Sequence, residues 1–204
     1  MGYTFADIAF TPSVRKIQEE HGSRAAYGRQ QQEGNRDFNR FGPDEVAFIE
    51  SRDSFYMASV GETGWPYVQH RGGAPGFVKV LDEKTLGFAD YRGNRQYIST
   101  GNLLSDDRVS LFFMDYPRKA RLKLLGHARI IGQGDEEMLH KLMAGENSPP
   151  VERGFVITLE AFDWNCPQHI TERFTLAEID QAVAPLKQRI AELESRLAAA
   201  GAGA

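Results

Sequence analysis

Short apolar runs alternate with turn residues through the middle of this chain. Four runs of strand length, 55–60, 66–71, 77–81 and 85–90, are rich in aromatic and β-branched residues. The segments between them contain the glycine, proline and aspartate residues typical of tight turns. The pattern therefore predicts four consecutive β-strands with short connections.

Three further strand-length runs follow, over 108–115, 120–131 and 154–162, with a bulge expected at Gly126. Many strands with few helices between them favour an antiparallel barrel over a doubly wound parallel sheet. We therefore expect a mainly β protein with peripheral helices.

Helical patterns are confined to short segments around the strands. Thr11 followed by Pro12 predicts the N-cap and the first position of a short helix. The stretch 24–40 is polar and rich in Gln and Arg, so it is expected to form a loop or a marginal helix. Further helices are predicted over 43–52, 95–106 and 135–144.

The C-terminal segment has a different pattern, with apolar residues at alternating spacings of four and three. These are Ile179, Val183, Leu186, Ile190, Leu193 and Leu197. They predict an amphipathic helix that Pro185 kinks or restarts, with a frayed end over 198–204. Its apolar face either packs on its own barrel or forms a dimer contact. The expected organisation is a helical or loop extension over 1–44, a barrel over 45–174, and this helix and tail over 175–204.

Composition narrows the classes of function. A chain of 204 residues that is 41% hydrophobic can bury a sizeable core, and a net charge of −4 without a basic block argues against nucleic-acid binding. No run approaches the roughly 18 apolar residues of a membrane span. The single cysteine, Cys166, excludes an intrachain disulfide. A soluble, cytoplasmic protein without a membrane role is expected.

Common catalytic and metal motifs are missing from the sequence. The five histidines are scattered without metal-ligand spacing, and there is no P-loop and no GxGxxG after a strand. Cys166 and His169 are three residues apart, but a thiol and an imidazole without an orienting third group are weak evidence for a nucleophile. We therefore expect no metal site and assign no catalytic side chain.

The strongest candidate for ligand chemistry is the segment 91–96, Tyr-Arg-Gly-Asn-Arg-Gln. It offers two guanidinium groups, two side-chain amides and a glycine just before a predicted helix. Arginine donates two parallel hydrogen bonds to phosphate, and a helix N-terminus adds backbone N–H groups. The segment predicts a phosphate-binding site in which Arg95 is the principal contact.

Five blocks, 64–67, 79–84, 87–96, 108–113 and 126–129, occur in an order that resembles the pyridoxamine 5′-phosphate oxidase family. The resemblance covers about residues 45 to 174. It implies a six-stranded antiparallel split β-barrel of Greek-key type that binds FMN. It also implies a homodimer with two FMN sites at its interface, each built from both subunits.

The resemblance also assigns residues to the cofactor site. Asn94, Arg95 and Gln96 match the family's FMN-phosphate motif, and Lys79 matches the lysine that ends a preceding strand. Gln69, His70 and Arg71 end the second strand, where donors would stabilise negative charge on reduced flavin. The remaining candidate FMN contacts are Tyr91, Arg121, Trp164, Gln168 and His169.

The C-terminal motif departs from the genuine oxidase. Trp164 and Arg173 match family positions, but His169 and Thr171 replace the Arg and His that contact the vitamin B6 substrate, and 133–153 is too short for the oxidase's helical insertion. We therefore expect an FMN-dependent oxidoreductase of the oxidase-related group, acting on an unidentified small molecule with a reductant such as NAD(P)H. The alternatives are a non-catalytic flavin carrier, sensor or storage protein, and a barrel that binds another planar cofactor such as a deazaflavin or haem.

Overall fold

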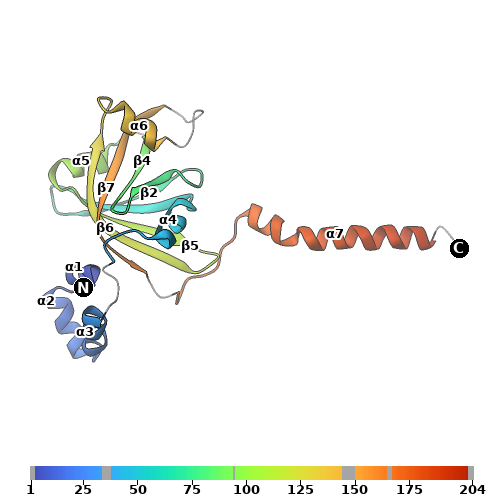
Figure 1. Cartoon of the computed structure of the whole chain (residues 1–204), viewed down its shortest axis with the longest axis horizontal. Coiled ribbons are helices and arrows are strands. Elements are labelled where there is room, and N and C mark those ends of the chain that lie inside the picture. The colour runs from blue at the N-terminus through green and yellow to red at the C-terminus, as the bar shows by residue number, and fades with distance from the viewer. Residues whose placement is uncertain (1–2, 34–37, 94, 144–149, 165–166, 202–204) are drawn as a thin grey trace. The chain divides into compact units, whose positions relative to one another are not determined.

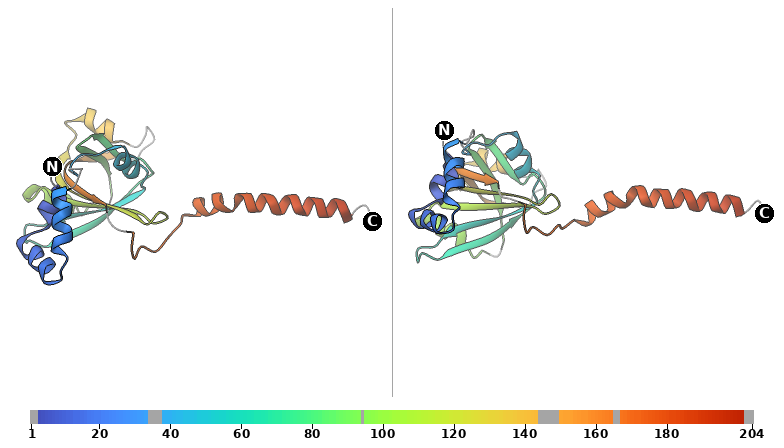
Figure 2. Two further views of the ribbon diagram at one scale, coloured as in Figure 1. Left: turned by 60° about the horizontal axis from the view of Figure 1, so that its bottom comes forward. Right: turned by 90° about the horizontal axis from the view of Figure 1, so that it is seen from below.

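The strands of this protein form one antiparallel sheet that curls into a barrel (Figures 1 and 2). The computed structural model describes residues 3–33, 38–93, 95–143, 150–164 and 167–201. Within these ranges the sheet contains β1 Ser54–Val60, β2 Pro66–Gly72, β3 Val78–Asp82, β4 Thr85–Tyr91, β5 Arg108–Asp115, β6 Ala120–Ile131 and β7 Val151–Trp164. Their order across the sheet is β2-β1-β5-β6-β7-β4-β3.

The expected mainly β fold with peripheral helices is confirmed, but the count of six strands is wrong. The described sheet has seven strands because each of the seven apolar runs finds a partner, including the short β3, which pairs with β4 through Val78 and Phe88. The register of the β6–β7 ladder shifts between Leu125 and Gly126, as predicted for this place, but the extra residue is Glu160 on β7 and not Gly126 itself. A Cβ on Gly126 would lie 2.4 Å from the Thr158 carbonyl oxygen, so only glycine fits there.

The barrel is split between β2 and the β3–β4 hairpin. Although β2 and β3 follow one another in the chain, they occupy opposite edges of the sheet. Side chains rather than a backbone ladder cross between these edges. Arg71 on β2 forms an ion pair with Asp90 on β4, and Phe55 stacks on Phe77 at 5.8 Å. Polar groups on the inward faces of both edges therefore meet at the split.

The interior of the barrel is aromatic. Phe55, Phe88, Phe113, Phe155 and Phe162 are fully buried. Phe55 stacks on Phe113 at 4.9 Å, and Phe88 stacks on Phe155 at 5.2 Å. Large side chains of this kind supply much of the burial that stabilises a small barrel. Phe88 and Phe155 lie on β4 and β7, so this core fixes two of the strands that carry the candidate site.

Short helices surround the barrel. They are α1 Thr4–Ala9, α2 Pro12–Glu20, α3 Arg24–Glu33, α4 Pro43–Glu50, α5 Ile98–Ser105 and α6 Glu136–Leu142. Thr11 caps α2 as predicted, because its hydroxyl accepts a hydrogen bond from the Val14 N–H at 3.4 Å. The predicted start of α5 at residue 95 is wrong. Arg95 and Tyr97 have φ values of 60° and 54°, which a right-handed helix cannot contain, so α5 begins at Ile98.

The chain divides into two compact units. The first contains residues 1–115 and 120–167, and the second contains 116–119 and 168–204. The second unit holds α7, Leu176–Gly201, which continues through Pro185. Thr175 and Glu178 cap its start, since the Thr175 N–H donates to Glu178 Oε2 at 2.8 Å and the Glu178 N–H donates to Thr175 Oγ1 at 3.2 Å. The predicted amphipathic tail helix is present.

Candidate functional site

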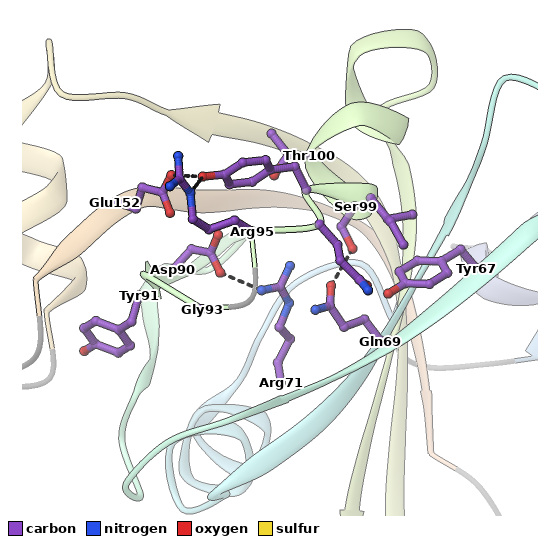
Figure 3. Close-up of a pocket in the computed structure, with 13 residues that line it drawn as sticks. Tyr67, Gln69, Arg71, Asp90, Tyr91, Gly93, Arg95, Ser99, Thr100 and Glu152 are labelled. Atoms are coloured by element: carbon purple, nitrogen blue, oxygen red, sulfur yellow. Dashed lines mark hydrogen bonds and ion pairs between the residues drawn. The ribbon is translucent and has the colours of Figure 1, made fainter.

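A pocket of about 280 Å³ opens at the split in the barrel (Figure 3). Its wall is formed by the end of β2, the end of β4, the segment that follows β4, the first turn of α5 and the start of β7. The lining residues are Tyr67, Gln69, Arg71, Asp90, Tyr91, Gly93, Arg95, Gln96, Tyr97, Ile98, Ser99, Thr100 and Glu152.

Strand alternation places three β2 side chains in this pocket. Gln69 and Arg71 lie opposite Met57 and Phe55 in the β1–β2 ladder, and both of these partners are buried in the core. Directly opposite residues share a face of the sheet, so Tyr67, Gln69 and Arg71 also face inward. In Figure 3, Gln69 and Arg71 project from β2 toward the segment that carries Arg95 and Ser99. Polar residues occupy the inward face here because the barrel is open at this edge.

Arg71 is anchored between a carboxylate and two aromatic rings. One terminal nitrogen lies 2.6 Å from Asp90 Oδ1, and the two side chains are 14% and 18% exposed. The guanidinium also lies 5.0 Å from the ring centroid of Phe155 and 5.7 Å from that of Phe88. Its buried Nε has no hydrogen-bond partner among the described residues. Arg71 therefore lines the pocket with a positively charged guanidinium that Asp90 and the two rings hold in place.

Arg153 supports the pocket from behind its lining. This side chain is 13% exposed, and it contacts Glu152 Oε1 at 2.5 Å, Thr100 Oγ1 at 3.2 Å and Asp90 Oδ2 at 3.5 Å. Its guanidinium also lies 4.6 Å from the centroid of the Tyr97 ring. Arg153 thus fixes four lining residues at once, from β4, β7, α5 and the segment before α5. We treat it as a positioning residue.

Arg95 is exposed and is oriented through a tyrosine. Its Nε donates to the Tyr97 hydroxyl at 3.0 Å, and that hydroxyl donates to Glu152 Oε1 at 2.6 Å. The hydrogen bond with Tyr97 raises the pKa of Arg95 and lowers the pKa of Glu152. Both groups are therefore charged at neutral pH.

The first turn of α5 completes the wall of the pocket. Tyr97 occupies the N-cap position but makes no side-chain hydrogen bond to the first turn. The buried Ser99 hydroxyl donates to Gln69 Oε1 at 2.8 Å, which links α5 to β2. An uncapped helix start offers backbone N–H groups and a partial positive charge to an anion.

The charged groups around the pocket leave an excess of positive charge. Arg71, Arg95 and Arg153 contribute three positive charges, and Asp90 and Glu152 contribute two negative ones. We call these five residues the arginine cluster, which carries a net charge of +1. Together with the hydroxyl, amide and backbone donors, the cluster is chemically suited to a phosphate or another small anion.

Two neighbouring pockets extend the concave surface. One of about 210 Å³ is lined by His70, Arg71, Gly72, Phe77, Phe88, Ala89, Asp90 and Tyr91. It shares the Arg71–Asp90 pair with the first pocket. The other, of about 260 Å³, is lined by Arg92, Arg95, Gln133, Pro150, Val151 and Glu152. A ligand longer than a phosphate therefore has room on either side of the arginine cluster.

The structure brings together half of the twelve cofactor residues predicted from the sequence. Gln69, Arg71, Tyr91, Arg95 and Gln96 line the first pocket, and His70 lines the pocket beside it. Asn94 lies outside the described residues.

The remaining predicted residues lie elsewhere. Lys79 is on β3, paired with Gly87 and outside the three pockets. Arg121 and Trp164 are at the end of the β6–β7 ladder opposite to Arg153, and the Trp164 Nε1 donates to Glu45 Oε1 at 2.7 Å. Gln168 and His169 belong to the second unit. Their contacts with a cofactor stay predictions.

Sequence reasoning missed Tyr67, Asp90, Tyr97, Ser99, Thr100, Glu152 and Arg153. Strand alternation could have found Tyr67, because it is two residues before Gln69 on the same strand. Arg153 could not be found locally, since it meets Asp90 through the β4–β7 ladder, in which these two residues are directly paired.

Across the described ranges, no three His, Cys, Asp or Glu side chains gather as a metal site would require. None of the described helices combines the length and hydropathy needed to cross a membrane.

Solved structures with a similar fold share little sequence with this chain. A single-site variant of HupZ from Group A Streptococcus is 17% identical, with a TM-score of 0.50, over 61% of this chain and 98% of that chain. A candidate pyridoxamine 5′-phosphate oxidase from Lactobacillus delbrueckii is 19% identical, with a TM-score of 0.48, over 61% of this chain and 94% of that chain. An F420 reductase is 17% identical, with a TM-score of 0.43, over 57% and 94%. At such identities the likeness concerns the fold alone.

Comparison at the level of families is more specific. No curated protein matches the chain. A sequence model of the pyridoxamine 5′-phosphate oxidase family, however, matches residues 41–164, which is more than half of the 204 residues and spans the whole barrel. The chain therefore belongs to the pyridoxamine 5′-phosphate oxidase family.

Proposed function

We propose that this protein binds FMN, with the phosphate of the cofactor in the pocket at the split of the barrel. One observation carries the proposal: the uncapped start of α5 and the arginine cluster meet in the same pocket. A phosphate monoester carries between one and two negative charges near neutral pH. The excess positive charge and the converging donors of this pocket match that group.

The residues present fit a phosphate in chemistry as well as in charge. Arg95 is exposed and uses its Nε for Tyr97, so its terminal nitrogens would contact the phosphate, and Arg71 adds a second guanidinium to the wall of the pocket. Thr100 and the first-turn N–H groups of α5 add neutral donors. Bidentate arginine contacts are the strong hydrogen bonds available to a phosphate. Arg153 would hold the surrounding side chains in place without touching the ligand.

The pocket is small for a whole cofactor. A volume of about 280 Å³ is at the lower limit of small-molecule sites, so it suits the phosphate end of FMN. The adjoining pocket, with Phe77 and Phe88 in its wall and His70 at its rim, would take part of the ring system. When bound, the isoalloxazine ring supplies hydride transfer. His70 would then offer a donor to a ring that gains negative charge, while Gln69 faces the first pocket.

We further propose that a second subunit completes each site. Tyr56, Val68 and Trp65 on or beside the β1–β2 edge leave large apolar side chains in solvent, with Val68 60% and Trp65 77% exposed. Exposed apolar groups gathered in this way are typical of association surfaces. In such a homodimer Arg121 and Trp164 would reach the site of the partner subunit. A flavin-loaded monomer at micromolar concentration, seen by sedimentation, would contradict this.

The reaction class that fits best is FMN-dependent oxidation or reduction of a small molecule, with NADH or NADPH as the reductant. We expect negligible pyridoxine 5′-phosphate oxidase activity, because His169 and Thr171 replace the residues that would pair with that substrate. A site that lacks partners for a phosphate and a pyridine hydroxyl loses on the order of 10³-fold in kcat/KM. Turnover within about tenfold of a genuine oxidase assayed in parallel would refute this expectation.

Absorption spectroscopy tests the cofactor and the turnover in sequence. The purified protein is titrated with FMN, with a deazaflavin and with haem, and only FMN is expected to saturate at micromolar concentration. The FMN-loaded protein is then mixed with NADH or NADPH without oxygen, and bleaching of the flavin band is expected. Saturation by a different cofactor overturns the FMN proposal. Stable flavin colour in the presence of both reductants favours a flavin carrier instead.

A further inference from the structure

The apolar residues of α7 follow a heptad repeat over most of its 26 residues. Numbering the repeat from Leu176 as position a, the a positions hold Leu176, Val183, Ile190 and Leu197, and the d positions hold Ile179, Leu186 and Leu193. All of these side chains are exposed except Val183, which is half-buried. A helix roughly 39 Å long with such a stripe is stabilised mainly by burying that stripe against another element.

We propose that α7 pairs with α7 of a second copy of this chain, as a parallel two-stranded coiled coil in register. The core residues favour this arrangement. In the two central heptads Val183 and Ile190 are β-branched residues at a, and Leu186 and Leu193 are leucines at d, which is the combination that selects two parallel strands. The exceptions, Leu176, Ile179 and Leu197, lie in the end turns of the helix.

The charged residues that flank the stripe also select the parallel orientation. Position g of one helix faces position e of the following heptad on its partner, which places Arg189 opposite Glu194. Arg189 also lies 3.0 Å from Glu192 of its own helix, so the proposed pair would share its guanidinium. Two-fold symmetry gives this attractive pair twice. An antiparallel alignment would instead bring the g positions together, and Arg189 and Arg196 would face each other's copies with like charge.

Contacts within α7 agree with the heptad assignment. Lys187 Nζ lies 3.1 Å from Asp180 Oδ1, so these two e positions lie along one side of the helix. Pro185 occupies a c position, on the side away from the stripe. The proline ring therefore does not project into the proposed contact surface, and the residues from Leu186 to Leu197 that follow it form the longer uninterrupted part of the stripe.

This pairing is independent of the FMN site and goes beyond it. It depends only on residues of α7, whereas the cofactor proposal depends on the barrel. Pairing through α7 would give the chain a second association surface, which raises the effective concentration of two copies for any other contact between them.

Disulfide trapping in the full-length protein tests the pairing. In a Cys166→Ser background, Leu193→Cys places a thiol at a d position, where a parallel in-register partner presents its own thiol within disulfide reach. Ser195→Cys, two residues away at an outward f position, is the matched control. Under mild oxidation, Leu193→Cys should give mainly a linked two-chain species on a non-reducing gel, and Ser195→Cys should stay a single chain.

The outcomes separate the possible occupants of the stripe. If α7 lies on its own barrel, Leu193→Cys stays a single chain and the proposal fails. If Leu193→Cys and Ser195→Cys give equal amounts of the linked two-chain species, the disulfides form by random collision, and this result also overturns the proposal. Charge reversal gives a second measurement in the Cys166→Ser, Leu193→Cys chain, where the linked fraction reports on α7 alone. Arg189→Glu and Glu194→Arg should each lower the disulfide-linked fraction, and the double variant should restore it. Failure of the double variant to exceed both single variants contradicts the parallel register.

Discussion

Asp90→Asn should lower the stability of the protein while it strengthens FMN binding. The Asp90 carboxylate lies 2.6 Å from one Arg71 nitrogen and 3.5 Å from the Arg153 Nε, in a pair that is largely shielded from solvent. Asparagine keeps the size of the side chain and one carbonyl acceptor, but it removes the charge. Loss of a charge-assisted hydrogen bond costs about 1.5–3 kcal/mol. For a chain of this length a loss of about 2 kcal/mol corresponds to a decrease in Tm of roughly 4–8 °C.

The same substitution raises the net charge of the arginine cluster from +1 to +2. A unit charge about 7 Å from one phosphate charge interacts by roughly 0.6 kcal/mol at a dielectric constant of 80 and by about 2.4 kcal/mol at 20. The dissociation constant for FMN should therefore fall by about threefold or more. Riboflavin has no phosphate, so its affinity should change little.

Denaturant unfolding of the apoprotein and titration calorimetry with both ligands measure the two effects separately. Asp106→Asn is the matched control, because it removes the same charge at the other end of α5, where Asp106 pairs with Arg108 on the surface. The control should leave the preference for FMN over riboflavin unchanged. Parallel changes in FMN and riboflavin affinity in Asp90→Asn would refute the assignment of the phosphate to this pocket.

Three further outcomes are expected. Arg95→Ala should weaken FMN binding more than riboflavin binding, and Arg95→Lys should recover only part of the loss; an unchanged FMN dissociation constant in calorimetry would remove Arg95 from the site. FMN affinity should rise from pH 5 to pH 7 as the phosphate loses its second proton near pH 6, with riboflavin as the flat reference. Protonation of Glu152 should not contribute to this pH dependence. The hydrogen bond from Tyr97 lowers the pKa of Glu152, so this carboxylate stays charged between pH 5 and pH 7. Gly126→Ala should destabilise the fold by more than about 2 kcal/mol, since its Cβ would lie 2.4 Å from the Thr158 oxygen; wild-type stability in urea would show that the bulge relaxes.

Local sequence patterns predict most of the strands, because the apolar runs and the turn residues between them can be recognised without knowing how the strands pair. The run 108–115 alternates buried and exposed residues, and it forms β5 over the predicted residues. The register shift beside Gly126 was also predictable, since an isolated glycine inside a strand pattern has few other uses. The start of α5 was not, because the left-handed conformations of Arg95 and Tyr97 depend on contacts with Glu152 and Arg153, which lie more than fifty residues away.

The candidate site also contains residues that can be identified from local sequence and residues that only the fold brings together. Gln69, Arg71 and Arg95 could be identified from residue type and position on predicted elements, and the structure places all three in one pocket. The contact between Asp90 and Arg153 could not be identified from the sequence, because these two residues meet only through the ladder between β4 and β7. Trp164 matches a family position. It lies at the end of β7 opposite to Arg153, where its Nε1 donates to Glu45. Sequence similarity gives the position of such a residue but not its contacts in the folded chain.

The ratio of FMN to riboflavin affinity tests the central claim most directly. The two ligands share the ring system and the ribityl chain and differ by the phosphate alone. Titration calorimetry of the full-length protein with each ligand, at one pH near 7 and one ionic strength, gives both dissociation constants. FMN should bind more tightly by at least about tenfold, which corresponds to one net charge-assisted hydrogen bond. Equal dissociation constants would contradict it, because the arginine cluster and the start of α5 would then make no contact with a phosphate.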